Sequence, residues 1–306
     1  MFEHIIPLLK KAEKIGIFTH LNPDGDAIGS AYALKLMLIG MGKKAEVFVE
    51  QAEDIKIKSL IKGMEESGMK TDECDLFISV DCAYSNRLGK YEEIFLKLQN
   101  TIAIDHHCAH KEYAKITVVK EMSSTCELLV ELCKEMGVKI SSDIANNLYV
   151  GLVSDTRNFM NSNISGDTFR KAAELIESGA DFERISRKLF ISKTREYYEL
   201  LRTALDRIEY YQDGKIGLLH LTDDDYEQTG CNMDFSGEMV YILCGIEDVE
   251  QAMKPFFTTL TNEERTGMGF SLMLSFMDKV EVESTLGSGT IVRMEKALSC
   301  GEGLDG

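Results

Sequence analysis

Short apolar runs that end in polar residues recur through the N-terminal half of the chain. The four runs are Ile15–Thr19, Ala45–Val49, Leu76–Val80 and Thr101–Ile104. Between the first two, apolar residues follow helical spacing over Ala27–Ile39, where Ala31, Leu34 and Leu38 share one face. Strands that are apolar throughout and alternate with helices are typical of a parallel sheet covered on both faces. The pattern therefore predicts an α/β fold with a parallel sheet flanked by helices.

Helical spacing dominates the middle of the chain. After an amphipathic helix within Met1–Lys14, helices are predicted at Thr125–Met136, Ser142–Asp155, Thr168–Ser178, Phe182–Leu189 and Thr194–Tyr211. We expect the last three to connect the sheet domain to the rest of the chain. Leu218–Leu221 is predicted as a strand that opens a second, smaller α/β domain.

Length and charge narrow the function classes. The 306 residues, a length typical of about two domains, carry a formal net charge of −17. Nonspecific binding to long nucleic acid needs a basic surface, so that class is disfavoured. Anionic substrates stay open, because bound divalent cations reverse the local sign of charge.

Features of membrane and exported proteins are missing from the sequence. The chain has no apolar run of about 18 residues that would span a membrane. Met1–Lys14 lacks the apolar core and cleavage site of a signal peptide. No two of the cysteines form a Cys-x-x-Cys pair, which disfavours zinc-ribbon and thioredoxin-like sites. We expect a cytoplasmic protein with reduced thiols and no membrane partner.

Side chains that bind metals follow the predicted strands. They are His20, Asp24 and Asp26 after the first strand, Asp81 after the third, Asp105, His106 and His107 after the fourth, and Asp155 at a helix end. Ligands of parallel sheets bind beyond the carboxyl ends of the strands, where these residues converge. Carboxylates and imidazoles without thiolates suit manganese, magnesium or iron, and their number exceeds the needs of one ion. Taken singly, each segment is also compatible with a turn, a helix cap or a hydrogen-bonded surface group. Together they predict a site for a pair of metal ions.

Four segments around these residues resemble the motifs of the DHH phosphoesterase superfamily. The segments are "THLNPDGDAIGSAYAL", "SVDCAYSNRLG", "AIDHHCAH" and "LYVGLVSDTRNF". The resemblance covers roughly residues 1–246 and is strongest to the NrnA-type branch, the bifunctional oligoribonucleases and phosphatases of pAp (3'-phosphoadenosine 5'-phosphate). It implies a DHH catalytic domain over 1–190, a connector helix over 191–212 and a DHHA1-like substrate domain that begins at 213.

The resemblance also implies how the metal-binding residues are divided. Two Mn²⁺ ions, for which Mg²⁺ can substitute, would be held by two sets of ligands that share one bridging carboxylate. The sets are His20 and Asp24 for one ion, Asp26, His106 and Asp155 for the other, and Asp81 as the bridge. A carboxylate shared by two ions can hold a hydroxide for in-line attack on phosphorus.

Three further residues would act around the metal pair. His107 would face the substrate and steady phosphate oxygens or the leaving group, and Asp105 would orient a histidine. Arg87 would contact phosphate, although a surface salt bridge is an equally open interpretation. Ser124 and Thr125 are expected to cap the helix that follows them.

The substrates that this branch implies are short nucleotides. They are short RNA or DNA oligonucleotides, dinucleotides included, and pAp, from which the enzyme would release mononucleotides or AMP and phosphate. A homodimer is an open expectation.

The C-terminal part departs from the NrnA-type branch. Members of the branch end in a glycine-rich "GGGH" segment that grips the nucleotide, but none follows here and His220 is the last histidine. Residues 213–246 are therefore expected to form only part of a substrate domain. Residues from about 246 to 297, with "PFFTT", "RTGMGF" and "GSGT", instead resemble the end of a sporulation anti-sigma-F factor serine kinase, a GHKL ATPase. We therefore expect 247–306 to be a GHKL ATPase-like fragment and tail.

The two resemblances meet at "IEDVEQA", so the chain is expected to be a chimera from gene fusion, recombination or an error of sequence assembly. The first half of an ATP site is missing ahead of the fragment, which disfavours a working kinase. Three functions stay open. They are an active phosphoesterase, a phosphoesterase impaired by the lost segment, and an interaction module whose tail binds a sigma factor.

Overall fold

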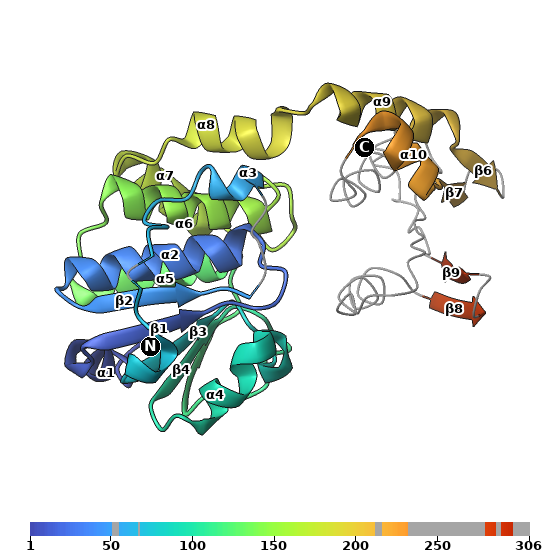
Figure 1. The fold of residues 1–306 in the computed structure, drawn as a ribbon. Coiled ribbons are helices and arrows are strands. Elements are labelled where there is room, and N and C mark those ends of the chain that lie inside the picture. The colour runs from blue at the N-terminus through green and yellow to red at the C-terminus, as the bar shows by residue number, and fades with distance from the viewer. Residues whose placement is uncertain (51–54, 67, 212–215, 232–278, 286–288, 296–306) are drawn as a thin grey trace, which may run out of the picture. The chain divides into compact units, whose positions relative to one another are not determined.

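A five-stranded sheet lies at the centre of the N-terminal part of the computed structural model (Figure 1). Its strands are β1 (Lys14–Phe18), β2 (Lys44–Phe48), β3 (Leu76–Val80), β4 (Thr101–Asp105) and β5 (Ile116–Val119). They are arranged in the order β2-β1-β3-β4-β5, and every neighbouring pair is parallel. The predicted α/β fold with a parallel sheet is confirmed. The sequence pattern missed β5, because this short edge strand is only partly buried and lacks the continuous apolar run of the others.

The structure describes residues 1–50, 55–66, 68–211, 216–231, 279–285 and 289–295. The chain divides into two compact units, Met1–Ser192 and Lys193–Gly306. The domain boundaries expected at 190, 212 and 246 remain predictions. The junction at "IEDVEQA" and the segments "PFFTT" and "RTGMGF" lie outside the described residues.

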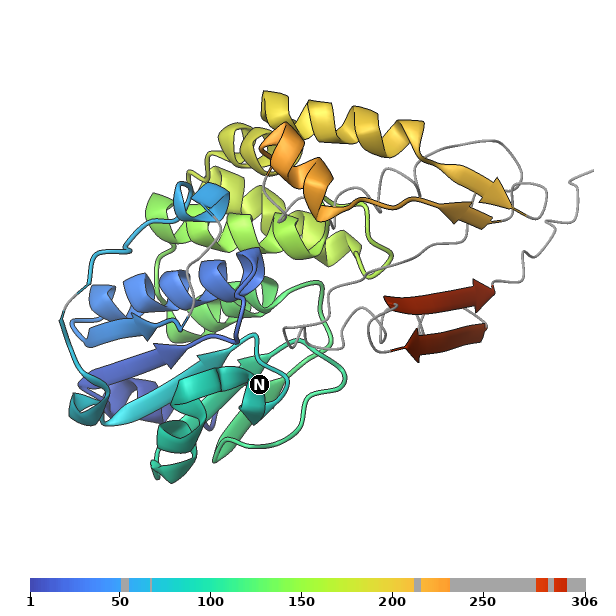
Figure 2. The ribbon, with the colours of Figure 1, turned by 45° about the vertical axis from the view of Figure 1, so that its right-hand side comes forward.

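Helices cover both faces of the sheet in the first unit (Figure 1 and Figure 2). They are α1 (Ile6–Lys11), α2 (Gly25–Gly40), α3 (Ile55–Lys58), α4 (Glu92–Lys97), α5 (Thr125–Met136), α6 (Ser142–Asp155), α7 (Gly166–Glu177) and α8 (Phe182–Ser186). On one face lie α2, α5 and α6, with α7 and α8 further out. On the other face lies α4, whose Phe95 packs 5.9 Å from the ring of Phe18. The helix predicted to reach Leu189 ends at Ser186 and continues as a π-helical turn, Arg187–Ile191.

Glycines allow α2 and α6 to approach each other closely. A Cβ atom on Gly29 would lie 2.5 Å from the carbonyl oxygen of Asn147 on α6. A Cβ atom on Gly151 would overlap Sγ of Cys126 and lie 2.7 Å from Oδ1 of Asp26. These two positions need glycine because the neighbouring helices leave no room for a side chain. The close contact brings the N-terminus of α2 and the C-terminus of α6 to the same end of the sheet.

The order of the strands reverses between β1 and β3. From β1 the chain adds β2 on one side, and then adds β3, β4 and β5 on the other. In open parallel sheets, a crevice forms at such a reversal, outside the carboxyl ends of the strands. His20 follows β1 and Asp81 follows β3, so the fold places both at this crevice.

The described part of the second unit begins with a helix and a small hairpin. Its elements are α9 (Arg195–Asp206), β6 (Glu209–Tyr211), β7 (Ile216–Leu218) and α10 (Asp223–Thr229). The helix predicted to reach Tyr211 is therefore too long, and the strand predicted at Leu218–Leu221 lies two residues earlier. Arg207 ends α9 by donating two hydrogen bonds to Asp225 on α10, at 2.5 and 2.7 Å. Residues Lys279–Thr285 and Gly289–Glu295 form a separate antiparallel hairpin, β8–β9.

None of the described helices combines the length and the hydrophobicity that a membrane span requires.

The six cysteines of the described residues are all free thiols. They are Cys74, Cys82, Cys108, Cys126, Cys133 and Cys231. Burial raises the pKa of the Cys82 and Cys133 thiols to about 12, which leaves both thiols protonated and unreactive.

Candidate metal centre

The loop after β1 supplies the first group of potential ligands. Asp24 is the N-cap of α2, and its carboxylate accepts hydrogen bonds from the N–H groups of Asp26 and Ala27 at 3.0 and 3.1 Å. Nε2 of His20 lies 4.0 Å from Asp24 and 3.7 Å from Asp81. The polar loop is thus both a helix cap and part of a cluster of ligands.

Asp81 lies at the centre of the cluster. It follows β3 directly, is 2% exposed, and has a left-handed backbone conformation with φ of 55°. Its carboxylate lies within 3.7 Å of ring nitrogens of His20, His106 and His107. A left-handed conformation is unfavourable for an aspartate, so the surrounding contacts must hold this residue in place.

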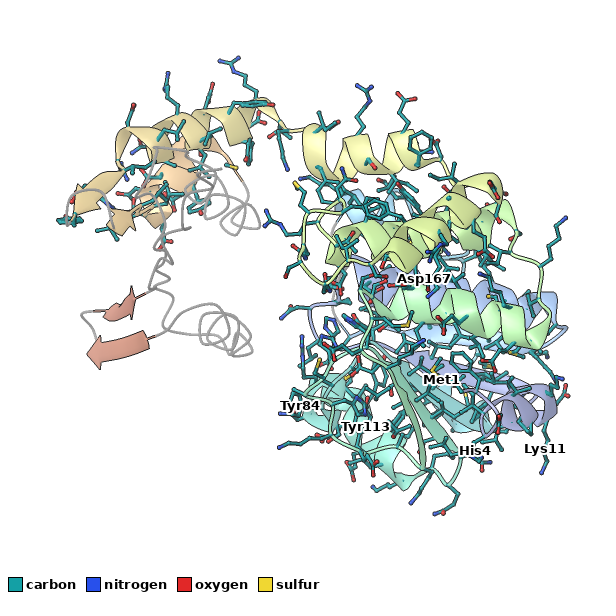
Figure 3. The ribbon with its side chains drawn as sticks, turned by 180° about the vertical axis from the view of Figure 1, so that it is seen from behind. Met1, His4, Lys11, Tyr84, Tyr113 and Asp167 are labelled. Carbon is teal, nitrogen blue, oxygen red and sulfur yellow. The ribbon has the colours of Figure 1, made fainter. Side chains whose placement is uncertain are left out.

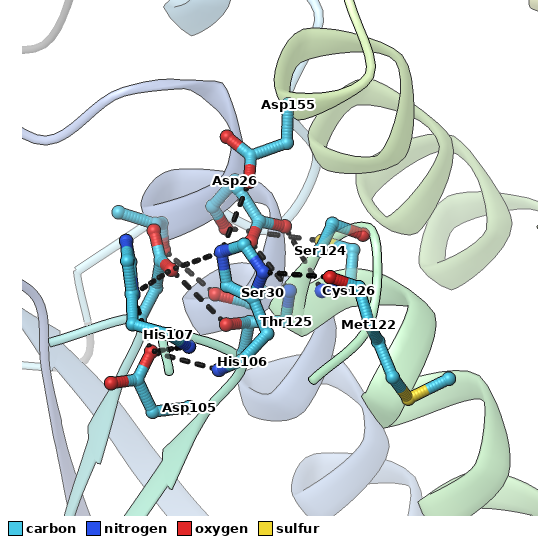
Figure 4. Close-up of polar contacts among 12 residues, drawn as sticks. Asp26, Ser30, Asp105, His106, His107, Met122, Ser124, Thr125, Cys126 and Asp155 are labelled. Carbon is cyan, nitrogen blue, oxygen red and sulfur yellow. Dashed lines mark hydrogen bonds and ion pairs between the residues drawn. The ribbon is translucent and has the colours of Figure 1, made fainter. Parts of the chain in front are cut away.

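His106 lies close to three carboxylates, of which Asp26 and Asp155 are labelled in Figure 4. Its Nε2 lies 3.0 Å from Asp155, 3.5 Å from Asp81 and 4.0 Å from Asp26. This nitrogen is buried and lacks a hydrogen-bond partner among the residues that the structure describes. Its other ring nitrogen, Nδ1, lies 3.1 Å from the carbonyl oxygen of Met122, to which it can donate. A ring nitrogen among carboxylates requires a proton or a metal ion, so the donor set fits a cation.

The N-terminus of α5 holds two of the carboxylates. The N–H groups of Thr125 and Cys126 donate to the two carboxylate oxygens of Asp26 at 2.6 and 2.9 Å. The hydroxyl of Thr125 donates to Oδ1 of Asp81 at 3.1 Å. A helix N-terminus stabilises negative charge, so α5 fixes both side chains and favours their ionised form.

Burial and mutual repulsion shift the pKa values of the acids in this cluster. Burial, together with the charges of Asp81 and Asp155, raises the pKa of Asp26 well above its usual range. Burial raises the pKa of Asp155 to about 6. Burial opposes the charged form of His106, but the nearby carboxylates, with Asp155 contributing most, raise its pKa to about 11. Divalent cations would offset this concentration of negative charge, which supports the fit of the site to metal ions.

The structure brings all six predicted metal ligands together. His20, Asp24 and Asp81 form a first ligand group, and Asp26, His106 and Asp155 form a second. Within each group the candidate atoms lie within 4.8 Å of one another. Asp81, His106 and His107 form a third, overlapping group. The first two groups match the predicted division of ligands, although their roles as ligands remain predictions.

Asp105 and His107 lie beside the second ligand group. The Asp105 carboxylate is completely buried, and its Oδ1 accepts a hydrogen bond from Nδ1 of His107 at 2.7 Å. The His107 side chain is 27% exposed, more than the side chain of His106 or His20. The predicted orientation of a histidine by Asp105 is compatible with this contact. A role for His107 toward substrate remains a prediction.

Arg87 lies beside His20. Its Nη2 lies 3.0 Å from Nδ1 of His20 and 3.4 Å from the carbonyl oxygen of Leu21. The Arg87 carbonyl in turn accepts a hydrogen bond from the N–H of Leu21 at 2.7 Å. The guanidinium therefore supports the loop that carries the first ligand group, and phosphate contact remains a prediction.

Sequence reasoning missed part of the site. Ser124 caps α5 as expected, but the Thr125 hydroxyl donates to Asp81 instead of capping. Asn147 on α6 is buried and pairs with the backbone of Lys62. Nδ1 of His110 donates to Asp105. The sequence predicts no role for His110, because a third histidine shortly after "DHH" is not a recognisable signal by itself.

Comparisons with known proteins agree with the geometry of the N-terminal part. Residues 14–152 match the model of the DHH family, N-terminal domain. The bifunctional oligoribonuclease and PAP phosphatase NrnA of Thermus thermophilus is 27% identical over 78% of this chain and 72% of that protein. An uncharacterised Mycoplasma genitalium protein is 26% identical over 62% of this chain and 59% of its own length. The chain therefore spans less than two thirds of the latter relative.

A solved structure shares the fold over most of the chain. The exopolyphosphatase-related protein of Bacteroides fragilis superimposes with a TM-score of 0.73 at 26% identity. The match covers 80% of this chain and 76% of that one. The fold that the sequence pattern predicted is thus also found in an experimental structure.

The C-terminal part resembles a different kind of protein. The anti-sigma F factor of Caldanaerobacter subterraneus subsp. tengcongensis is 67% identical over 54 residues, which are 18% of this chain and 38% of that protein. The expected change of resemblance along the chain is confirmed. The chain thus combines a region that matches the DHH family, N-terminal domain, and resembles NrnA proteins with a C-terminal stretch that is similar to anti-sigma F factors.

Proposed function

We propose that this protein hydrolyses phosphate esters of short nucleotides with the help of two Mn²⁺ ions, for which Mg²⁺ can substitute. The proposed substrates are short oligonucleotides, dinucleotides included, and pAp. The observation that carries the proposal is the arrangement around Asp81, which joins both ligand groups at the crevice of the sheet. The similarity to the NrnA protein of Thermus thermophilus supports the choice of substrates.

The residues of the chain would share the work as follows. His20 and Asp24 would hold one ion, Asp26, His106 and Asp155 the other, and Asp81 both. Bound there, the ions would stabilise charge on the phosphoryl oxygens and provide a water nucleophile that is active near neutral pH. His107, whose Nδ1 bonds to Asp105, would offer its other ring nitrogen to a phosphate oxygen or to the leaving group.

A hydrolysis assay tests the proposal. The full chain is incubated with a two-residue RNA or with pAp, with and without Mn²⁺, and the release of AMP is measured. We expect Mn²⁺-dependent AMP from at least one substrate, and we expect Asp81→Asn to abolish it. Asp143→Asn is the matched control, because Asp143 is exposed in the first turn of α6 and lies outside both ligand groups. Loss of activity in both variants, or turnover without metal, contradicts the proposal.

The tail supports a second candidate function. The 67% identity to an anti-sigma F factor over 54 residues favours an interaction role for the C-terminal part. In that case the DHH domain binds metal but turns over nucleotides slowly, because groups that grip the substrate have been replaced. Binding of the full chain to an immobilised sigma factor supports this candidate. Rapid turnover together with no sigma-factor binding excludes it.

A further inference from the structure

Asp105 contacts two histidine side chains, one at each carboxylate oxygen. Oδ1 lies 2.7 Å from Nδ1 of His107, and Oδ2 lies 2.6 Å from Nδ1 of His110. Oδ1 also accepts hydrogen bonds from the backbone N–H groups of His106 and His107, at 2.8 and 3.3 Å. An ionised carboxylate can only accept hydrogen bonds, so both imidazoles must carry a proton on Nδ1.

Within the described residues, the side chain of His110 makes one polar contact, to Asp105, and otherwise packs against its neighbours. Its side chain is 3% exposed, and its ring stacks on Tyr113 with 5.3 Å between ring centroids. Tyr113 is labelled in Figure 3. The Tyr113 ring is itself fixed, because its hydroxyl donates to the carbonyl oxygen of Cys82 at 2.8 Å. Nε2 of His110 is buried without a hydrogen-bond partner in the described part of the chain.

An unsatisfied buried nitrogen costs free energy that a phenylalanine would avoid. Packing on Tyr113 therefore does not explain why position 110 is a histidine. What a histidine adds there is the Nδ1–H that points to Oδ2 of Asp105. Among the described residues, it is the only donor to that oxygen.

The orientation of His107 depends on this second anchor. The hydrogen bonds to Oδ1 hold that oxygen, but they restrain Oδ2, and with it the plane of the carboxylate, less tightly. The bond from His110 to Oδ2 fixes the plane of the carboxylate as well. With the plane fixed, Nδ1 of His107 stays on Oδ1, although Asp81 offers it a competing oxygen at 3.6 Å.

We propose that His110 is a positioning residue, which acts through Asp105 to keep Nδ1 of His107 protonated and its Nε2 available to the substrate. The inference deepens the proposed function and rests on it for the identity of the substrate. His110 itself does not touch the substrate. Loss of this kind of support for a site residue typically lowers activity about 10- to 100-fold.

Two substitutions separate positioning from packing. His110→Phe keeps the ring and its stacking on Tyr113 but removes the donor. His110→Asn removes the ring but places an amide N–H close to the position of Nδ1. If His110 positions His107, kcat falls about 10- to 100-fold in the Phe variant with little change in KM, and the Asn variant recovers most of it. If His110 only packs, the Phe variant is active and the Asn variant is the weaker one.

Proton NMR of the metal-free protein tests the same inference without any assay of activity. With ¹⁵N-labelled histidine, the wild-type protein should show both His107 and His110 protonated on Nδ1, with both protons at low field. In His110→Phe, we expect the His107 Nδ1 proton to lose its low-field position, and in His110→Asn we expect it to return. A wild-type His110 that is protonated on Nε2 alone, or a His107 signal that is unchanged in His110→Phe, overturns the inference. The NMR result does not depend on activity. If the wild-type protein hydrolyses no nucleotide, that result refutes the proposed function but leaves the test of His110 intact.

Discussion

The hydroxyl of Thr125 donates a hydrogen bond to Oδ1 of Asp81 across 3.1 Å, and both residues are buried. The backbone N–H of Thr125 donates to Asp26 at 2.6 Å. One residue at the start of α5 thus holds the central carboxylate of the cluster and one carboxylate of the second ligand group. The Thr125 side chain and the N-terminus of α5 therefore support the same site. Their partners are distant in the sequence, because Asp81 lies 44 residues and Asp26 lies 99 residues before Thr125.

Replacing Thr125 with valine should weaken metal binding more than it weakens the fold. Valine has nearly the same shape, so the packing at the start of α5 is kept while the bond to Asp81 is lost. We expect Mn²⁺ affinity to fall about 10- to 100-fold in isothermal titration calorimetry. Thr203→Val is the control, because the Thr203 hydroxyl bonds to the Glu199 carbonyl within α9. Equal Mn²⁺ affinity in the two variants would show that the Thr125 hydroxyl has no part in the site.

A methyl group at Gly151 should disturb both stability and the metal site. The added Cβ would overlap Sγ of Cys126 and press on Oδ1 of Asp26. Gly151→Ala is expected to lower the free energy of unfolding by about 1–3 kcal/mol, because the packed helices have little room to move.

Gly40→Ala is the matched control for Gly151→Ala. Gly40 lies at the exposed end of α2, and nothing lies within 4 Å of the position of its missing Cβ. Alanine there should raise the free energy of unfolding by about 0.5–1 kcal/mol, through its higher helix propensity. Urea denaturation of both variants measures the two changes, and a change of the same sign in both would contradict the close approach of α2 and α6.

Lys171 should be a sensitive position outside the metal centre. Its buried ammonium group lies 3.1 Å from Glu127, 2.7 Å from Glu131 and 2.9 Å from Asp167. Lys171→Met leaves the buried Glu127 carboxylate without its cation, so we expect the free energy of unfolding to fall by about 3–5 kcal/mol. Lys134→Met, which breaks the exposed Lys134–Glu174 pair between the same two helices, should cost at most about 1 kcal/mol. If chemical denaturation shows the same loss of unfolding free energy in both variants, burial does not make the Lys171 ion pairs more important than the Lys134 pair.

The same cluster predicts how stability depends on pH. Burial alone would raise the pKa of Glu131, but hydrogen bonds and charge from Lys171 and Lys120 lower it below its ordinary value of 4.5. A carboxylate with a lowered pKa contributes stability above its unfolded pKa, and this is lost as the pH falls through the folded pKa. Between about pH 5 and pH 3, the wild type should therefore lose more stability than Lys171→Met. Denaturation of both proteins across this pH range measures the two losses. Equal losses of unfolding free energy would contradict the stabilisation of Glu131 by Lys171.

The parallel sheet and the ligands could be predicted because both leave local signals. Leu76–Val80 is apolar throughout and ends directly before Asp81, so one pattern marked both a buried strand and a polar residue at its carboxyl end. The edge strand Ile116–Val119 gave no such signal, because its residues are mostly half-exposed. The end of α9 was misplaced because it depends on the contact of Arg207 with Asp225, eighteen residues further along the chain.

The residues that support the ligands were harder to predict than the ligands. Thr125 looked like an ordinary helix cap, because its partner Asp81 is distant in sequence and close only after folding. His110 has the same difficulty, since its role depends on the burial of its ring beside Tyr113 and on the free oxygen of Asp105. Spacing along the chain identifies residue types that can bind metal, but the contacts that orient them require the tertiary structure.

Crystals of the full chain grown with Mn²⁺ would test the central claim most directly. Anomalous diffraction at the manganese edge locates each ion and the atoms that hold it. We predict two peaks, one held by the first ligand group and the other by the second, with Asp81 contacting both ions. A single peak, or two peaks that do not share Asp81, would contradict the proposed two-ion centre.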